Sequence, residues 1–164
     1  MSSCLVRRAT SDDAGAAVAV LRASITELCV PDHQNEGTTL APWLSNKTVA
    51  HFRRWLEDPE SFVLVAELAS LVSGVGMLNQ SGEIRLCYVQ PGLQRSGIGS
   101  ALLAALEAQA RACGCEQLRL QSTAVARAFY ESHGFVSQGA PIARTGLAVA
   151  YPYFKRLEIL VRSH

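Results

Sequence analysis

Two glycines, Gly97 and Gly99, stand where an apolar run gives way to a helical stretch. The first N–H groups of a helix lack partners within it, and the helix macrodipole adds positive character at that end. Glycine has no Cβ, so a phosphate can approach the backbone closely. The turn therefore predicts a binding site for a phosphorylated cofactor, with polar neighbours as further donors. The residues expected to bind the phosphates are Gln94, Arg95, Ser96, Gly97, Ile98, Gly99 and Ser100.

The spacing of these residues excludes two common phosphate-binding motifs. A dinucleotide fingerprint needs a third glycine, where this chain has Leu102, and an acidic residue about 20 positions further on. The strand expected there, residues 117–122, contains no acidic residue. A P-loop needs Lys and then Ser or Thr directly after its last glycine. Here Ser100 and Ala101 follow Gly99.

The pattern that remains is Arg or Gln, two residues, Gly, one residue, then Gly or Ala. It resembles the pyrophosphate-binding motif of the GCN5-related N-acetyltransferase (GNAT) superfamily, which uses acetyl-CoA. A second block, residues 123–135, resembles the downstream signature of that family: an Ala, then Phe129-Tyr130, then Gly134-Phe135. The resemblance implies an enzyme that transfers the acetyl group of acetyl-CoA to a primary amine of a small molecule or peptide, by direct attack in a ternary complex.

The resemblance also implies roles for individual residues. In the family, the strand before the phosphate loop opens, and its backbone pairs with the pantetheine arm. Tyr130 matches the tyrosine whose hydroxyl points at the CoA sulfur. Glu83 stands fourteen positions before Gly97, the separation of the catalytic glutamate in the histone-acetylating branch. Thr123 replaces an Asn found in many members, and it either helps to hold the cofactor or caps the next helix. The strand residues implied are Leu86, Cys87, Tyr88 and Val89.

Acetyl transfer to an amine requires two proton movements. A lysine-like ammonium has a pKa of about 10.4, so less than roughly 0.1% of it is deprotonated at neutral pH. Glu83 is the candidate base, acting through a water. The leaving thiol has a pKa of about 8.5, and a tyrosine of pKa about 10 is protonated at neutral pH. Tyr130 is therefore the candidate acid.

Composition limits the class of protein. The chain has 164 residues, 49% of them hydrophobic and 18% charged, with a formal net charge of +1. These values indicate a single domain over residues 1–164 and argue against disorder or a nucleic-acid partner. The five cysteines lack paired CxxC spacing, and the four histidines are scattered, so no metal site is expected. No apolar run is long enough for a signal peptide or a membrane span, which favours the cytoplasm.

Hydrophobic periodicity predicts a mixed α/β (α+β) domain that resembles the GNAT fold. Its predominantly antiparallel sheet would have about six or seven strands flanked by four helices. Residues 30–44 contain two prolines and a glycine and are expected to form an irregular loop. The expected strands are residues 4–9, 62–68, 71–78, 83–89, 117–122, 135–138 and 146–157. The expected helices are one from residues 10–13 to 28, one capped by Ser45 and ended by Pro59, one over 98–113, and about ten residues up to His133.

The acceptor is less well defined by the sequence. In this fold the first two helices, their connection and the last hairpin usually form the acceptor side. Their acidic and aromatic residues slightly favour a cationic amine over an amino acid or a peptide N-terminus, and they do not separate either from an antibiotic or an arylamine. A rival interpretation is a non-catalytic acyl-CoA-binding regulatory module, which would need neither Glu83 nor Tyr130. Homodimers are common in the family, but no segment shows a dedicated interface. The candidate acceptor residues are Asp32, His33, Glu36, Trp43, Tyr151 and Tyr153.

Overall fold

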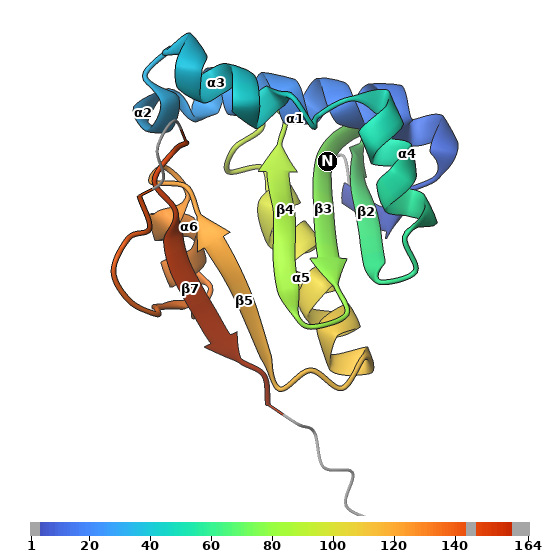
Figure 1. Cartoon of the computed structure of the whole chain (residues 1–164). Coiled ribbons are helices and arrows are strands. Elements are labelled where there is room, and N and C mark those ends of the chain that lie inside the picture. The colour runs from blue at the N-terminus through green and yellow to red at the C-terminus, as the bar shows by residue number, and fades with distance from the viewer. Residues whose placement is uncertain (1–3, 144–146, 159–164) are drawn as a thin grey trace, which may run out of the picture.

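The computed structural model describes residues 4–143 and 147–158, and a seven-stranded sheet runs through them (Figure 1). The strand order is β1-β2-β3-β4-β5-β7-β6, and every neighbouring pair is antiparallel except β4 and β5. The predicted mixed and mainly antiparallel architecture is therefore confirmed. The strands are β1 (Cys4–Arg8), β2 (Ser61–Leu68), β3 (Leu71–Asn79), β4 (Glu83–Val89), β5 (Gln117–Ser122), β6 (Val136–Ser137) and β7 (Tyr151–Arg156).

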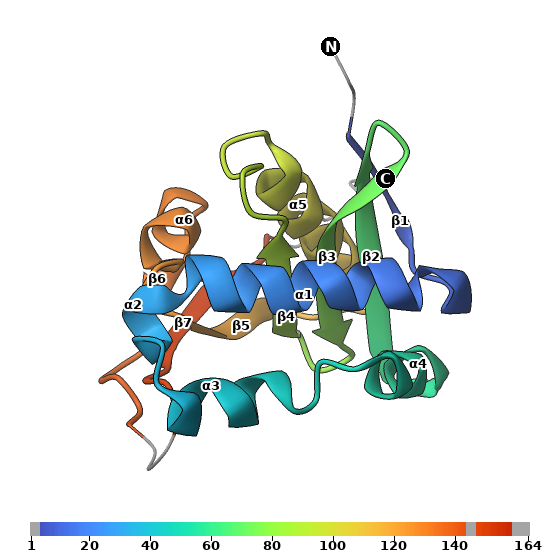
Figure 2. The ribbon, with the colours of Figure 1, turned by 90° about the horizontal axis from the view of Figure 1, so that it is seen from above.

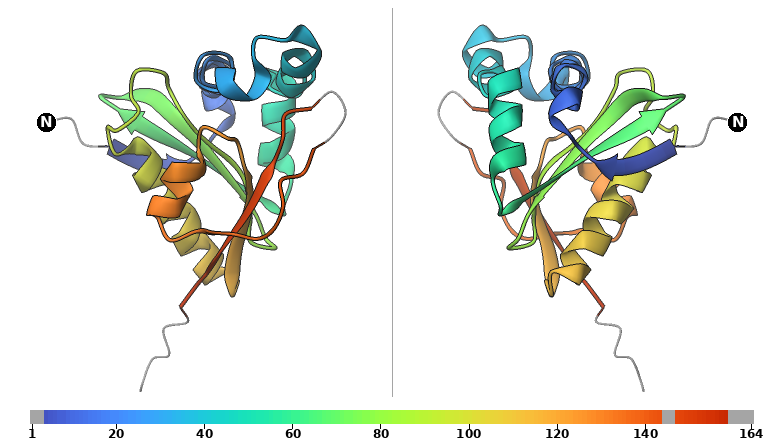
Figure 3. Two further views of the ribbon diagram at one scale, coloured as in Figure 1. Left: turned by 90° about the vertical axis from the view of Figure 1, so that its left-hand side faces the viewer. Right: turned by 90° about the vertical axis from the view of Figure 1, so that its right-hand side faces the viewer.

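Helices cover both faces of the sheet (Figures 2 and 3). The apolar side of α1 packs with Phe52 of α4 against β2, β3 and β4, which forms one core. The apolar side of α5 packs against the opposite face and forms a second core, which extends to β5, β7 and Tyr130 of α6. The described helices are α1 (Ala14–Leu28), α2 (Val30–His33), α3 (Gly37–Leu44), α4 (Val49–Glu57), α5 (Ile98–Ala112) and α6 (Arg127–Ser132), with a 3₁₀ turn, η1, at Ser11–Asp13.

Two glycines of β3 allow α5 to lie close to the sheet. A Cβ on Gly74 would lie 2.8 Å from Ile98 Cγ2 and 2.9 Å from Leu102 Cδ1. A Cβ on Gly76 would lie 3.3 Å from Leu106 Cδ1. Because Ile98 is the first residue of α5, the missing side chains determine where the helix N-terminus lies relative to β4.

β4 and β5 separate after a short paired region. Only Glu83 with Arg119 and Ile84 with Leu120 are in parallel register. The register of β3 and β4 shifts at this level, since Leu78 pairs with Ile84 but Met77 pairs with Leu86. Arg85 is therefore an extra residue in β4, and such a bulge bends and twists its strand. The bulge lies where β4 leaves β5, so beyond it the side of β4 that faces β5 has no strand partner.

Several predicted boundaries are wrong. Residues 30–44 contain α2 and α3 rather than an irregular loop, so the described helices number six instead of four. Pro31 lies in the first turn of α2, where a proline needs no N–H partner. Thr48, not Ser45, caps α4, because its Oγ1 accepts the His51 N–H at 3.2 Å.

The predicted elements near the C-terminus are longer than those observed. α6 has six residues, and β6 has two. β7 begins at Tyr151 rather than at residue 146, which lies outside the described residues. Before β7, a single bridge joins Ile142 and Ala150. The expectation failed because the ladder with β5 extends only from Tyr151 to Arg156.

Candidate active site

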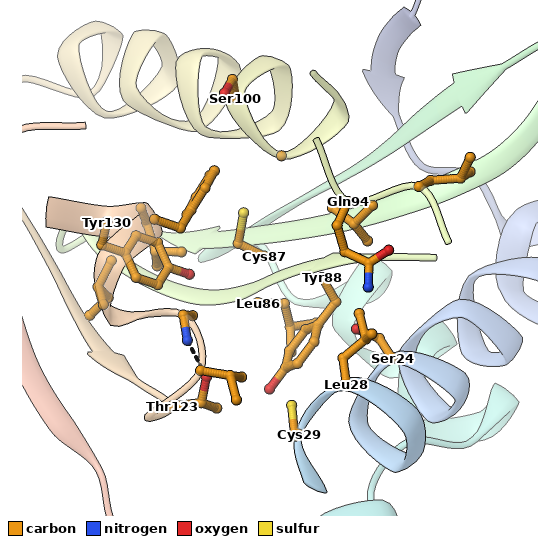
Figure 4. Close-up of a pocket in the computed structure, with 18 of the residues that line it drawn as sticks. Ser24, Leu28, Cys29, Leu86, Cys87, Tyr88, Gln94, Ser100, Thr123 and Tyr130 are labelled. Carbon is orange, nitrogen blue, oxygen red and sulfur yellow. Dashed lines mark hydrogen bonds between the residues drawn. The ribbon is translucent and has the colours of Figure 1, made fainter. Parts of the chain in front are cut away.

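A pocket of about 610 Å³ lies between the separated parts of β4 and β5 and reaches the N-terminus of α5 (Figure 4). It brings together the predicted strand residues Leu86 to Val89 and most of the predicted phosphate-binding loop. Among the residues predicted to bind the cofactor, Ser96 and Ile98 do not line the pocket, and the predicted base Glu83 does not line it either. Those that line it are Leu86, Cys87, Tyr88, Val89, Gln94, Arg95, Gly97, Gly99, Ser100, Thr123 and Tyr130.

Ser96 and Ile98 face away from the pocket for identifiable reasons. The Ser96 hydroxyl donates to the Leu93 carbonyl at 2.5 Å, which holds the turn before α5. Ile98 is fully buried in the core formed by α5. Any contribution of these two residues to ligand binding therefore comes from their main chain.

The two loop glycines have different structural roles. Gly97 has φ of +89°, a left-handed conformation that favours glycine, and a Cβ there would meet no atom within 4 Å. A Cβ on Gly99 would instead lie 3.2 Å from the Phe129 ring of α6. Gly97 thus leaves open space at the helix N-terminus, whereas Gly99 permits the contact between α5 and α6.

Polar side chains around the loop have partners of their own. The Gln94 Oε1 accepts the Gly92 N–H at 2.7 Å. The His133 Nδ1 lies 2.8 Å from the Phe129 carbonyl, which requires a proton on Nδ1. In the neutral ring, Nε2 then accepts from the Ser100 hydroxyl at 2.9 Å. His133 therefore orients Ser100 at the edge of the pocket.

Tyr130 is buried at the inner end of the pocket. Its ring packs edge-on against Phe129 and Phe135, with centroids 5.3 and 5.6 Å away. Its hydroxyl points toward Cys87 (Figure 4). Burial, together with the neighbouring Cys87 and Tyr88, raises the pKa of Tyr130 well above its usual value. The phenol is therefore protonated at neutral pH, as a proton donor must be.

Cys87 lies beside Tyr130 on β4. Burial raises the pKa of its thiol to about 12, despite the opposing effect of a hydrogen bond with Tyr130. A thiol with this pKa holds its proton at neutral pH and is a poor nucleophile.

Glu83 lies apart from the pocket lining. It is the first residue of β4 and pairs in register with Arg119. Four residues separate it from Cys87, which is about 13 Å along a strand. The structure thus brings the predicted acid, but not the predicted base, to the pocket.

Thr123 begins the segment that leads into α6. Its Oγ1 accepts the Ala126 N–H at 3.3 Å, so it caps the turn before the helix as one of the two predicted roles requires. It also lines the pocket.

The sequence did not predict the opposite wall of the pocket. Ser24, Leu28 and Cys29 at the end of α1 form this wall. Together with α2, which follows directly and supports it, we call it the α1–α2 wall. The three residues lie more than fifty positions before β4, and nothing in their local pattern marks them as pocket residues. Phe129, by contrast, belongs to the recognised second block and lines the pocket beside Tyr130.

Three of the candidate acceptor residues have structural partners instead. The Asp32 carboxylate accepts the N–H groups of Ala124 and Val125 at 2.6 and 3.4 Å. The His33 Nε2 lies 2.9 Å from the Ile25 carbonyl and is buried. The Tyr153 hydroxyl donates to Glu131 at 2.9 Å. These groups connect elements of the fold, and none of the six candidates lines the pocket.

The described part of the chain lacks two other kinds of feature. Within residues 4–143 and 147–158, no three His, Cys, Asp or Glu side chains gather in a way that would hold a metal ion. No helix in the same ranges is long and apolar enough to span a membrane.

Comparison with known proteins identifies the family. The family model described as an acetyltransferase (GNAT) domain matches residues 29–155. The chain belongs to the GNAT acetyltransferase family. The match confirms three predictions from the sequence: the resemblance to this family, the fold and the acetyl-CoA-dependent acetyltransferase activity.

Solved GNAT structures share the whole architecture. A GCN5-related N-acetyltransferase from Rhodopseudomonas palustris is 26% identical, with a TM-score of 0.84 over 96% of this chain and 98% of that one. A ribosomal-protein-alanine N-acetyltransferase from Brucella melitensis is 25% identical, with a TM-score of 0.72 over 93% and 99%. The PaiA N-acetyltransferase from Thermoplasma acidophilum, in complex with coenzyme A, has a TM-score of 0.79 at 18% identity over 94% and 99%. The comparison with curated proteins finds no match.

Proposed function

We propose that this GNAT protein transfers the acetyl group of acetyl-CoA to a primary amine of a small molecule or peptide, by direct attack within a ternary complex. One observation carries the proposal. The protonated Tyr130 hydroxyl faces Cys87 on the part of β4 that has left β5, in a pocket that continues to the N-terminus of α5. A proton donor, an open strand and an anion-binding helix end thus share one pocket.

The residues present fit acetyl-CoA. The main chain of Leu86–Val89 lacks a strand partner on the β5 side and can pair with the amide groups of a pantetheine arm. The α5 N-terminus, with open space at Gly97, offers N–H groups to a diphosphate. When bound there, acetyl-CoA supplies a thioester whose acyl carbon accepts the amine.

Tyr130 is the proposed general acid. Its phenol keeps its proton at neutral pH, because the pKa of a tyrosine is about 10 even in water and burial raises it further. It can therefore give a proton to the departing CoA sulfur, and such a positioned acid typically contributes about 10²–10⁴-fold to the rate.

The state of Cys87 supports direct attack over a covalent acyl-enzyme. An acyl-cysteine route needs a thiolate, but burial raises the pKa of Cys87 to about 12. The attacking nucleophile is therefore the acceptor amine itself.

Glu83 remains the proposed general base. Because it lies outside the pocket lining, four positions before Cys87 on β4, it would act through water molecules rather than by direct contact. The amine would pass its proton to this water and then to the carboxylate.

The decisive experiment measures release of free CoA by the purified full chain with acetyl-CoA and a broad amine panel. We expect Tyr130→Phe to lower kcat about 100-fold while leaving the Kd for CoA unchanged, because only the transferable proton is removed. Tyr151→Phe is the matched control, since Tyr151 lies outside the pocket lining. Binding of CoA without turnover of any amine would favour the non-catalytic acyl-CoA-binding module instead.

A further inference from the structure

We propose that Arg85 binds an anionic group, a carboxylate or a phosphate, on the amine acceptor. The inference rests on the proposed acetyl transfer and specifies which acceptors that site takes. It replaces the cationic acceptor favoured by the sequence, because Asp32, His33 and Tyr153 are engaged in structural contacts.

The charge of the pocket lining is the first observation. Among the described residues that line the pocket, Arg85 and Arg95 are charged, and no carboxylate is present. Arg95 belongs to the loop before α5 and therefore to the proposed diphosphate site. Arg85 is then the charged lining residue that an acceptor can contact. Its positive charge favours an acidic molecule over a polyamine.

The position of Arg85 in β4 is the second observation. Arg85 is the extra residue of the bulge, and bulges beside active sites commonly redirect a side chain. Ile84 before it is buried in the α5 core, and Leu86 after it is buried in the α1 core. Arg85 itself is exposed and lines the pocket. The same irregularity thus opens the strands and places a guanidinium at the opening.

Within residues 4–143 and 147–158, Arg85 forms no ion pair and no cation–π contact. The ion pairs of the described residues join Arg7, Arg111 and Lys155 to other carboxylates. The cation–π contacts involve Arg8, Arg127 and Lys155. The guanidinium of Arg85 is therefore free to bind a carboxylate or phosphate with two parallel hydrogen bonds.

The distance from Arg85 to the reacting centre suits an acceptor whose amine and anionic group are close together. Arg85 lies two residues before Cys87, or about 7 Å along the strand. Gln121, the next lining residue across the gap on β5, can add a neutral donor. An acceptor whose anionic group is a few bonds from its amine can therefore contact Arg85 while the amine lies near Tyr130.

The test compares matched amines as acceptors. β-Alanine and β-alaninamide differ in a carboxylate, O-phosphoethanolamine and ethanolamine differ in a phosphate, and cadaverine supplies a second positive charge. We expect the wild-type chain to have the higher kcat/KM for the anionic member of at least one pair. The pair with the larger preference distinguishes a carboxylate from a phosphate.

Variants at Arg85 then identify the cause of the preference. Arg85→Ala should lower kcat/KM for the preferred anionic amine about tenfold to 100-fold, as expected for the loss of charge-assisted hydrogen bonds. It should change kcat/KM for the matched amine without the anionic group by no more than about threefold, since that amine cannot form such bonds. Arg85→Lys should keep part of the preference. Arg156→Ala is the matched control, because Arg156 is exposed on β7 outside the pocket lining.

The outcomes separate this inference from the proposed function. Efficient acetylation of cadaverine or the neutral amines, without an Arg85 effect, would overturn the inference and leave acetyl transfer standing. If no amine is acetylated, acetyl transfer fails, and calorimetry with N-acetyl-β-alanine and N-acetyl-phosphoethanolamine in the presence of CoA decides the inference. Binding that Arg85→Ala abolishes supports an anion site, and absence of binding in the wild type overturns it.

Discussion

The two walls of the pocket are built in different ways. The wall formed by β4 and α5 consists largely of main-chain groups, exposed by a bulge and by Gly97. The α1–α2 wall is held in place by side chains whose partners are distant in the sequence. Asp32, for example, accepts the Ala124 N–H. The first wall is therefore specified by a short stretch of sequence, and the second by contacts across the fold.

Substituting the two loop glycines should break the β4–α5 wall most strongly. Gly99→Ala places a Cβ 3.2 Å from the Phe129 ring, so this ring, which packs against Tyr130, must shift by a few tenths of an ångström. We expect a loss of about 1–3 kcal/mol in stability, as for other overpacked sites, and a rise of about tenfold in the Kd for CoA. Calorimetric titration with CoA and thermal unfolding measure both effects.

Gly97→Ala is the matched control for this clash. Its Cβ meets no protein atom, so the expected cost is the left-handed backbone, about 1–2 kcal/mol. The kcat of the CoA-saturated Gly97→Ala variant should be close to wild type, whereas that of Gly99→Ala should fall. Equal kcat values for the two variants would contradict the separate roles of these glycines.

Glu83→Gln tests whether Glu83 takes the proton from the acceptor amine, and its expected effect is smaller than that of the glycine variants. Because Glu83 lies outside the pocket lining, we expect kcat at pH 7 to fall only about tenfold, less than for Tyr130→Phe. The deficit should shrink as the pH approaches about 10.4, where a lysine-like amine loses its proton without help. A pH–rate profile, with Glu57→Gln of α4 as the control, shows whether this happens. A deficit that stays constant with pH would assign Glu83 a purely structural role.

Asp32→Ala should weaken the α1–α2 wall with the smallest change in rate. The substitution leaves the Ala124 N–H without its 2.6 Å partner, so the free energy of unfolding should fall by about 1–3 kcal/mol. The KM for the acceptor should rise more than the Kd for CoA. Thermal unfolding and steady-state kinetics measure these effects, and Asp32→Asn, which keeps one acceptor oxygen, should lie between wild type and Asp32→Ala. An unchanged Tm would show that the connection carries no stability.

The β4–α5 wall could be predicted from the sequence because its signals are local. Gly97 and Gly99 follow a strand and begin a helix, and that order is visible without tertiary contacts. Tyr130 could be placed because the second block keeps a fixed spacing from the first. The bulge at Arg85 could not be predicted, because it exists only in the register between β3 and β4.

The α1–α2 wall could not be predicted because tertiary contacts override its local signals. Pro31 suggests a loop, yet it lies in the first turn of α2, where the missing N–H costs little. Gly37 likewise begins the following helix, α3. Asp32 looks like a free carboxylate in the sequence, but its partners lie 92 and 93 positions away. Because the partners are so far away in the sequence, local patterns do not reveal that Asp32 is already hydrogen-bonded within the fold.

A crystal structure of the chain with coenzyme A would show whether the ligand lies in the gap between β4 and β5. We expect the pantetheine amides to pair with the main chain of Leu86–Val89, the diphosphate to bind the N–H groups that begin α5, and the sulfur to lie near the Tyr130 hydroxyl. A diphosphate bound elsewhere, or β4 closed against β5 with the ligand outside the gap, would contradict the proposed site.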